Sequence, residues 1–147
     1  SSCFDYKKLL LNIDTKNVVL YFQFSFLDAN FQIEVSKFIS SKKTYFQLDI
    51  IGNLAETGNW YSNLNEDFSK LNTIQKNTNR CISVSGDLYQ NAGATITQQL
   101  AYTLAHANEY LHKYGSEVAP KIHFNFSVGS NYFFEIAKLR SFRILWT

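Results

Sequence analysis

The 147-residue sequence lacks several features that mark whole classes of protein. It has no apolar run of the roughly 20 residues that a membrane-spanning helix needs, and its first residues, SSCFDYKKLL, lack the hydrophobic core of a signal peptide. Neither sign of charge dominates, because 14 lysines and arginines are nearly balanced by 12 acidic residues. We therefore expect a protein that is neither membrane-bound nor secreted and that has no electrostatic basis for binding nucleic acid.

Cysteine and methionine are scarce or missing. Cys3 and Cys81 are the only cysteines, and no partner is spaced for a metal-binding or redox motif, so we expect two reduced thiols without a role. The absence of methionine leaves no initiator, and Trp146 and Thr147 lie in a helical pattern without a stop signal. We expect a segment of a longer protein that is large enough for one domain with a core.

Four β-branched and aromatic segments predict strands. They are Val18 to Phe24, Tyr45 to Ile51, Cys81 to Ser85 and Ile122 to Ser127. A helical pattern follows each strand, and a short helix capped by Asp5 precedes the first. The expected helix starts are Asp28 or Asn30, Asn65, Asn91, and Ser130 or Asn131, and the helix begun by Asp28 or Asn30 is expected to end near Ser40 to Lys43. Residues 53–63 are expected to form a long loop.

The helix predicted from Asn91 to Tyr114 has an apolar stripe and a polar side. The residues expected to be buried are Ile96, Leu100, Leu104, Ala107 and Leu111. Those expected on the opposite, exposed side are Gln99, His106, Glu109 and Lys113. Gly115 is the predicted stop.

Each predicted strand has one apolar and one unusually polar face. The polar residues are Gln23, Ser25, Gln47, Asp49, Ser83, Ser85, His123, Asn125 and Ser127. Strands of a doubly wound sheet are apolar on both faces, whereas the wall of a barrel with a wet or ligand-filled lumen would be polar on one. We therefore predict an α/β fold with four consecutive parallel βα units, about half of a (β/α)8 TIM barrel. The alternative is a half-buried sheet with a few satisfied polar groups.

Candidate chemistry concentrates in the turn SGDLYQNAGAT, where a strand ends and a helix begins, the place where parallel α/β folds bind ligands. We expect Gly86 to allow a tight exit from the strand, and Gly93 with Ala92 and Ala94 to allow close backbone approach. These small residues are compatible with a ligand and equally with helix packing.

Other reactive side chains favour structural roles. His106 and His112 are six residues apart on one predicted helix, so they cannot share a metal, and we expect both on the surface. His123, beside Asn125 on the polar face, is more typical of a hydrogen-bonded structural histidine than of a catalyst. Glu135 and Lys138 are predicted to pair on the surface. The sequence contains no Ser-His-Asp arrangement, phosphate loop or metal-ligand spacing.

Two long motifs, SGDLYQNAGATITQQLAYTLAHANEYL and KIHFNFSVGSNYFFEIAKLRSFRILW, together resemble the substrate barrel of the methylmalonyl-CoA mutase family. These adenosylcobalamin enzymes interconvert (R)-methylmalonyl-CoA and succinyl-CoA by a radical rearrangement. The first half, with IGNLAETGNWY, resembles the small-subunit branch. Catalytic members carry SGYHMQEAGA, in which the histidine contacts the substrate thioester. The matching positions are Ser85, Gly86, Gln90, Ala92, Gly93 and Ala94, while Asp87 replaces the tyrosine and Leu88 replaces the histidine.

The resemblance implies a non-catalytic small subunit of a cytoplasmic bacterial mutase, in a heterodimer with a catalytic large subunit. Leu88 cannot make the histidine's contact, and the Arg- and Pro-rich stretch that helps to hold substrate is absent. Coenzyme A threads along the polar lumen of the family's barrel. The candidate lumen or turn positions are Gln47, Asp49, Ser85, Gly86, Leu88, Gln90, Gly93, His123 and Asn125.

Adenosylcobalamin is expected in the whole enzyme and not on this segment, because nothing here matches the family's cobalt-ligating motif. One alternative is an active acyl-CoA mutase that uses other residues, such as His123 or Tyr89. A weaker one is an unrelated barrel enzyme with a phosphate-binding end. Half a barrel leaves open strand edges and apolar helix flanks, among them Phe133, Ile144 and Trp146, so the isolated segment is expected to self-associate.

Overall fold

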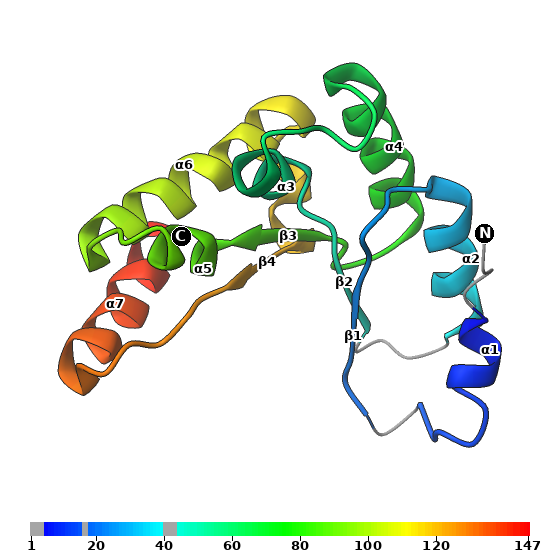
Figure 1. Cartoon of the computed structure of the whole chain (residues 1–147), viewed down its shortest axis with the longest axis horizontal. Coiled ribbons are helices and arrows are strands. Elements are labelled where there is room, and N and C mark those ends of the chain that lie inside the picture. Colours follow the sequence, from blue (N-terminus) through cyan, green and yellow to red (C-terminus); the bar gives the residue numbers. More distant parts are fainter. Residues whose placement is uncertain (1–4, 16–17, 40–43) are drawn as a thin grey trace.

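Short parallel strands form the centre of the structure, a computed structural model that describes residues 5–15, 18–39 and 44–147 (Figure 1). Strand β1 (Leu20–Gln23) pairs with β2 (Thr44–Gln47), and β3 (Ile82–Ser85) pairs with β4 (Ile122–Asn125), both in parallel. An isolated parallel bridge between Leu48 and Ile82 links the two pairs. Within each pair the strands are shorter than predicted but neighbouring and parallel, as predicted. The sheet of four consecutive βα units and the barrel beyond it stay predictions.

Helices follow and flank these strands. They are α1 (Tyr6–Leu9), α2 (Ala29–Phe38), α3 (Ile50–Thr57), α4 (Leu64–Asn77), α5 (Gly86–Asn91), α6 (Ile96–Tyr114) and α7 (Tyr132–Leu145), with the 3₁₀ helix η1 at Ser116–Lys121. Six of them begin with a side chain that accepts a hydrogen bond from a first-turn backbone N–H. These caps are Asp5, Asp28, Asp49, Asn63, Thr95 and Asn131. Asp5, Asp28 and Asn131 confirm predicted starts, whereas the cap predicted at Asn65 is Asn63.

The second strand ends four residues before the predicted end at Ile51, and α3 replaces the end of that strand and the first part of the expected loop. Asp49 accepts a hydrogen bond from the backbone N–H of Gly52 and so begins a helix directly after the strand. Gly58, with a φ of 75°, ends it. The β-branched Ile50 and Ile51 favour a strand by propensity, but the cap and the burial of Ile50 in the core stabilise the helix.

The predicted helix from Asn91 to Tyr114 is wrong at its start, because the structure has two helices here. Helix α5 ends at Asn91, and Gly93 turns the chain with a φ of 86°. Helix α6 then starts with a capping box, in which Thr95 and Gln98 satisfy each other's backbone N–H groups. Gly115 caps the end of α6, as predicted.

One apolar core lies between the strands and the helices. Alternate strand residues enter it, and the strongly buried ones include Phe46, Leu48, Ile82 and Val84, with Val35, Leu71, Ile74 and Ala107 from the helices. This alternation agrees with the predicted apolar face. Cys81 is a buried, free thiol, while Cys3 and the helix end expected near Ser40 to Lys43 lie outside the described residues.

Helix α6 is rotated from the predicted orientation. Its buried residues are Gln99, Thr103, His106, Ala107 and Tyr110, whereas the predicted stripe apart from Ala107 is only half-buried. Glu109 and Lys113 are exposed as expected. The polar side turns inward because Asp49 binds His106 and Tyr110, and Lys138 binds Gln99.

Helix α7 leaves large apolar side chains in solvent, with Phe133 80% and Ile144 77% exposed. Trp146 differs from the expectation, because its ring packs edge-on against Phe124 at 4.8 Å. In the described part of the chain, no helix combines the length and the hydrophobicity needed to cross a bilayer.

Candidate functional site

A cleft of about 570 Å³ lies along the polar faces of the strands, at their carboxyl ends. The described residues that line it are Gln23, Phe24, Ser25, Gln47, Asp49, Gly52, Asn53, Glu56, Tyr61, Ser83, Ser85, Asp87, Leu88, Asn91 and Asn125. The structure therefore brings together five candidates of the sequence analysis, namely Gln47, Asp49, Ser85, Leu88 and Asn125. Gly86, Gln90, Gly93 and His123 are not among the residues that line it.

Asp49 is the most highly connected residue of the cleft. Its Oδ1 accepts hydrogen bonds from the Gly52 N–H at 2.8 Å and the Tyr110 hydroxyl at 2.9 Å, and it lies 2.8 Å from Nε2 of His106. Its Oδ2 accepts one from the Ser85 N–H at 2.9 Å. One carboxylate thus joins the end of β2, the start of α3, the end of β3 and the middle of α6.

These contacts keep Asp49 ionised although it is buried. Burial alone would raise the pKa of this carboxyl, but the hydrogen bond from His106 and those from the N–H groups of Gly52 and Ser85 outweigh it and lower the pKa below its ordinary value of 3.8. The buried Tyr110 has a pKa well above 10.0, because burial and the charge of Asp49 both disfavour its anion. Tyr110 therefore remains a hydrogen-bond donor to Asp49.

His106 is buried in the structure, not on the surface as we expected. Its Nε2 lies 2.8 Å from Asp49, and its Nδ1 lies 3.1 Å from the Tyr89 hydroxyl on α5. An ionised carboxylate only accepts hydrogen bonds, so Nε2 of His106 carries a proton. His106 was missed because its partners come from distant parts of the sequence.

The two glycines of the SGDLYQNAGAT turn have roles opposite to those predicted. A β-carbon on Gly86 would lie 2.8 Å from Oγ1 of Thr103 and 2.9 Å from the Phe126 ring, so Gly86 permits close packing. Gly93 has open space around it, and its φ of 86° is the conformation that glycine favours. The small residues thus pack α5 and turn the chain.

His123 lies outside the cleft lining, with its ring edge-on to Tyr45 at 5.3 Å. Desolvation lowers its pKa to about 4, so the ring is neutral at physiological pH. Neither of its buried ring nitrogens has a hydrogen-bond partner in the described part of the chain. We expected a structural histidine held by a hydrogen bond. The structure agrees with this expectation only in part, because among the described residues His123 lacks that hydrogen bond.

Glu135 and Lys138 form the predicted pair, but they are buried. Their charged groups lie 2.5 Å apart, and the Lys138 ammonium also donates to the Ser127 carbonyl at 2.8 Å and to Gln99 at 3.2 Å. Lys138 is only 1% exposed. The pair ties α7 to α6 and to the segment that follows β4, so it belongs to the scaffold of the site.

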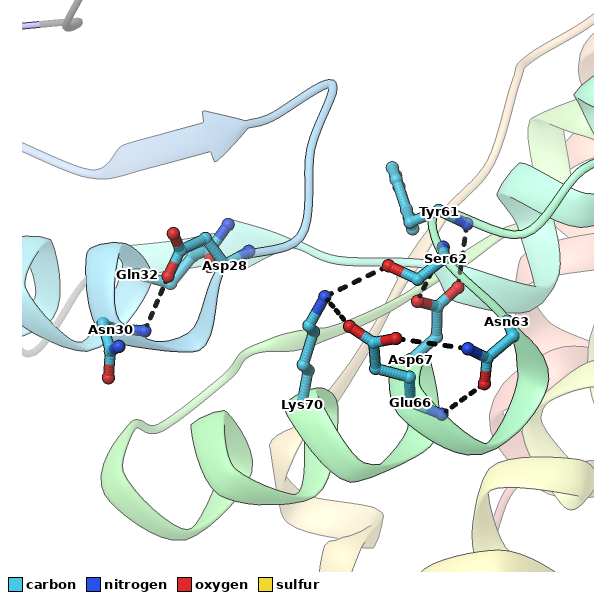
Figure 2. Close-up of polar contacts among 9 residues, drawn as sticks. All are labelled: Asp28, Asn30, Gln32, Tyr61, Ser62, Asn63, Glu66, Asp67 and Lys70. Atoms are coloured by element: carbon cyan, nitrogen blue, oxygen red, sulfur yellow. Dashed lines mark hydrogen bonds and ion pairs between the residues drawn. The ribbon is translucent and has the colours of Figure 1, made fainter.

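Tyr61 is a cleft residue that the sequence analysis missed. The buried Asp67 of α4 holds its loop, accepting hydrogen bonds from the backbone N–H groups of Tyr61 at 2.8 Å and Ser62 at 3.1 Å (Figure 2). Burial and the charges of Asp49, Asp67 and Glu56 raise the pKa of Tyr61. The sequence feature that could have identified Tyr61 is the aromatic pair Trp60 and Tyr61 in an otherwise polar stretch.

The charged residues of the cleft lining share one sign. Asp49, Glu56 and Asp87 are acidic, and the described lining residues include no lysine, arginine or histidine. Leu88 is one of the few apolar side chains of the lining. Such a cleft can offer hydrogen bonds to a polar ligand, but its charge disfavours an anionic group.

The profile of the methylmalonyl-CoA mutase family matches residues 40–147, which is well over half of the sequence. The chain belongs to the methylmalonyl-CoA mutase family. Among curated relatives, the methylmalonyl-CoA mutase small subunit of Porphyromonas gingivalis is 47% identical over 73 residues, covering 46% of this chain and 12% of that protein. The large subunit of Streptomyces virginiae is 48% identical over 72 residues, covering 44% of this chain and 10% of that protein.

A third mutase, from Rhizobium meliloti, is 44% identical over 72 residues, covering 45% of this chain and 10% of that protein. The matched segment thus spans about a tenth of the length of these mutases. Both subunit types occur among them at similar identity, so the identities do not distinguish small from large subunit. No solved structure matches the sequence.

Adenosylcobalamin is the cofactor that membership of the mutase family suggests for the whole enzyme. Histidine is a common metal ligand in proteins, yet His106 is held by Asp49 and Tyr89, and His123 lies against Tyr45 outside the cleft lining. Within the described residues, no cluster of three or more His, Cys, Asp or Glu could hold a metal ion. The cleft residues do not fit a cobalt ligand set, and we derive no step through this cofactor.

Proposed function

We propose that this chain is part of the barrel wall of a small, non-catalytic subunit of a methylmalonyl-CoA mutase, in a cytoplasmic bacterial heterodimer. The catalytic large subunit would bind adenosylcobalamin and perform the radical rearrangement. The observation that carries the proposal is that Leu88 lines the cleft. Leucine can neither donate a hydrogen bond to a thioester oxygen nor exchange a proton, whereas the histidine of catalytic family members contacts this group.

The charge of the cleft supports the same proposal. Methylmalonyl-CoA carries a free carboxylate, which an enzyme holds with a cation or several hydrogen-bond donors. Asp49, Glu56 and Asp87 line this cleft without a cationic residue among the described ones. Asp49 is also ionised and buried, so its charge is weakly screened. The free carboxylate of methylmalonyl-CoA would therefore bind poorly here.

The alternative, an active mutase with a replacement for the histidine, finds no support at the named residues. The Tyr89 hydroxyl is directed to His106 of α6, and Tyr89 does not line the cleft. His123 is likewise outside the lining. A phosphate-binding barrel enzyme is disfavoured by the acidic lining, since phosphate sites use cations and backbone N–H groups.

The test uses the whole protein that contains this chain, expressed with an affinity tag in its own bacterium. We expect a larger mutase subunit to purify with it, and we expect succinyl-CoA formation from the complex with adenosylcobalamin but not from the tagged subunit alone. Turnover by the separated subunit would overturn the non-catalytic assignment. Purification of the tagged protein without a mutase subunit would overturn the heterodimer.

A further inference from the structure

Helix α5, which carries Leu88, depends on other elements for its position. It has six residues, and the Ser85 side chain at its start makes no capping hydrogen bond. Such a short helix is not stable by itself in water. Leu88 lines the cleft, while the next residue, Tyr89, contacts α6. The contacts of Tyr89 therefore help to position α5, and with it Leu88 in the cleft lining.

Tyr89 joins α5 to the base of the cleft through His106. The Tyr89 hydroxyl lies 3.1 Å from Nδ1 of His106, and the opposite ring nitrogen, Nε2, lies 2.8 Å from Asp49. Tyr89 also packs against Tyr102 of α6 with ring centres 5.4 Å apart. Because Asp49 additionally binds the N–H groups of Gly52 and Ser85, the chain of contacts fixes α5 relative to both strand ends.

The two nitrogens of His106 have separable roles. Nε2 carries its proton toward the ionised Asp49, so in the neutral imidazole Nδ1 is an acceptor for the Tyr89 hydroxyl. The first contact holds the end of β2 and the start of α3, and the second holds α5. A substitution can therefore remove one contact and leave the other.

We propose that His106 is a positioning residue that holds α5, and with it Leu88, over the cleft by binding Tyr89 through Nδ1 and Asp49 through Nε2. The proposal rests on the proposed function in one respect, the interpretation of Leu88 as the residue that replaces a catalytic histidine. Its test measures no mutase activity, so either proposal can fail without the other.

The test is amide hydrogen exchange of the whole protein, followed at residues 86–91 of α5 and at residues 50–53 of α3. In H106Q, the side-chain amide reaches the place of Nε2 and keeps a donor for Asp49 but offers nothing to Tyr89. In H106N, the shorter amide reaches the place of Nδ1 and can accept from Tyr89 but does not reach Asp49. Y89F removes only the hydroxyl.

We expect H106Q and Y89F to raise exchange in residues 86–91 about fivefold to tenfold, the effect of losing one hydrogen bond, with little change in residues 50–53. H106N should raise exchange in residues 50–53 and change exchange in residues 86–91 little. His112 lies exposed on the same helix, and H112Q is the matched control that should change neither segment. Equal effects of H106Q and H106N on both segments, or unchanged exchange of α5 in Y89F, would show that His106 only fills space.

Discussion

A β-carbon on Gly52 would overlap the carboxylate of Asp49, which caps the helix that Gly52 belongs to. The two residues fit together because the Gly52 N–H donates to Oδ1 of Asp49 at 2.8 Å. The same oxygen also accepts from Tyr110. Gly52 is therefore required for the space it leaves and not for a left-handed backbone.

Gly52→Ala should lower the free energy of unfolding by about 1–3 kcal/mol, the usual cost of overpacking a filled site. The added methyl group would displace the Asp49 carboxylate from its donors. Chemical denaturation measures the effect, with the exposed Glu56→Ala on the same helix as control. A stable Gly52→Ala protein would mean that the carboxylate can move without loss.

Asp49 should make stability depend on pH in the acidic range. Its pKa is lower in the folded protein than its ordinary 3.8, so ionised Asp49 stabilises the fold above about pH 3.8, and this contribution is lost as the pH falls through the folded pKa. The stability difference between the wild type and Asp49→Asn should therefore be largest near neutral pH and shrink below pH 3.8. Urea midpoints at several pH values measure it, and a constant difference would contradict the assignment.

Lys138→Met should destabilise the protein by about 3–5 kcal/mol, because it leaves the carboxylate of Glu135 buried without its cation. The double variant Lys138→Met/Glu135→Leu should recover most of this loss, since it removes both charges together. Arg140→Met, at an exposed position on the same helix, is the control for thermal or chemical unfolding. If the single and double variants have the same free energy of unfolding, the charges of the pair do not contribute to stability.

The strand faces could be predicted because alternation is a local signal. Gln47 and Asp49 were assigned to the polar face from their spacing alone, and both line the cleft. The apolar partners Phe46 and Leu48 are buried as expected. Helix α3 was missed although its local signals were present, namely a capping Asp49 and a terminal Gly58.

The burial of polar side chains could not be predicted from local patterns. His106 and Asp49 are 57 residues apart in the sequence, and Lys138 and Gln99 are 39 apart. A helical pattern reports only which side is more apolar, and it therefore placed His106 in solvent. The physical reason for the error is that a buried polar group is stable once its partners satisfy it.

The chain by itself should self-associate through the exposed face of α7. Phe133 and Ile144 are 80% and 77% exposed, and burying such a side chain stabilises an interface by about 1.5–3 kcal/mol. Sedimentation velocity at micromolar concentration should show dimers or larger species. Phe133→Asp/Ile144→Lys should shift them toward monomer, whereas a wild-type chain that stays monomeric would show that this face tolerates solvent.

Leu88→His tests how much of a catalytic site the cleft retains. The new imidazole would line the cleft, on a helix held by Tyr89 and His106. It would still lie over a lining with Asp49, Glu56 and Asp87 and without a described cation, so the carboxylate of methylmalonyl-CoA would remain unbound. We therefore expect no succinyl-CoA from the Leu88→His variant of the proposed small subunit, separated from its partner and supplied with adenosylcobalamin, as measured by chromatography of the acyl-CoA products. Leu88→Gln, with a neutral polar side chain, is the control. Activity in Leu88→His alone would mean that a single substitution separates the proposed non-catalytic subunit from a catalytic one, and that the acidic lining does not exclude substrate.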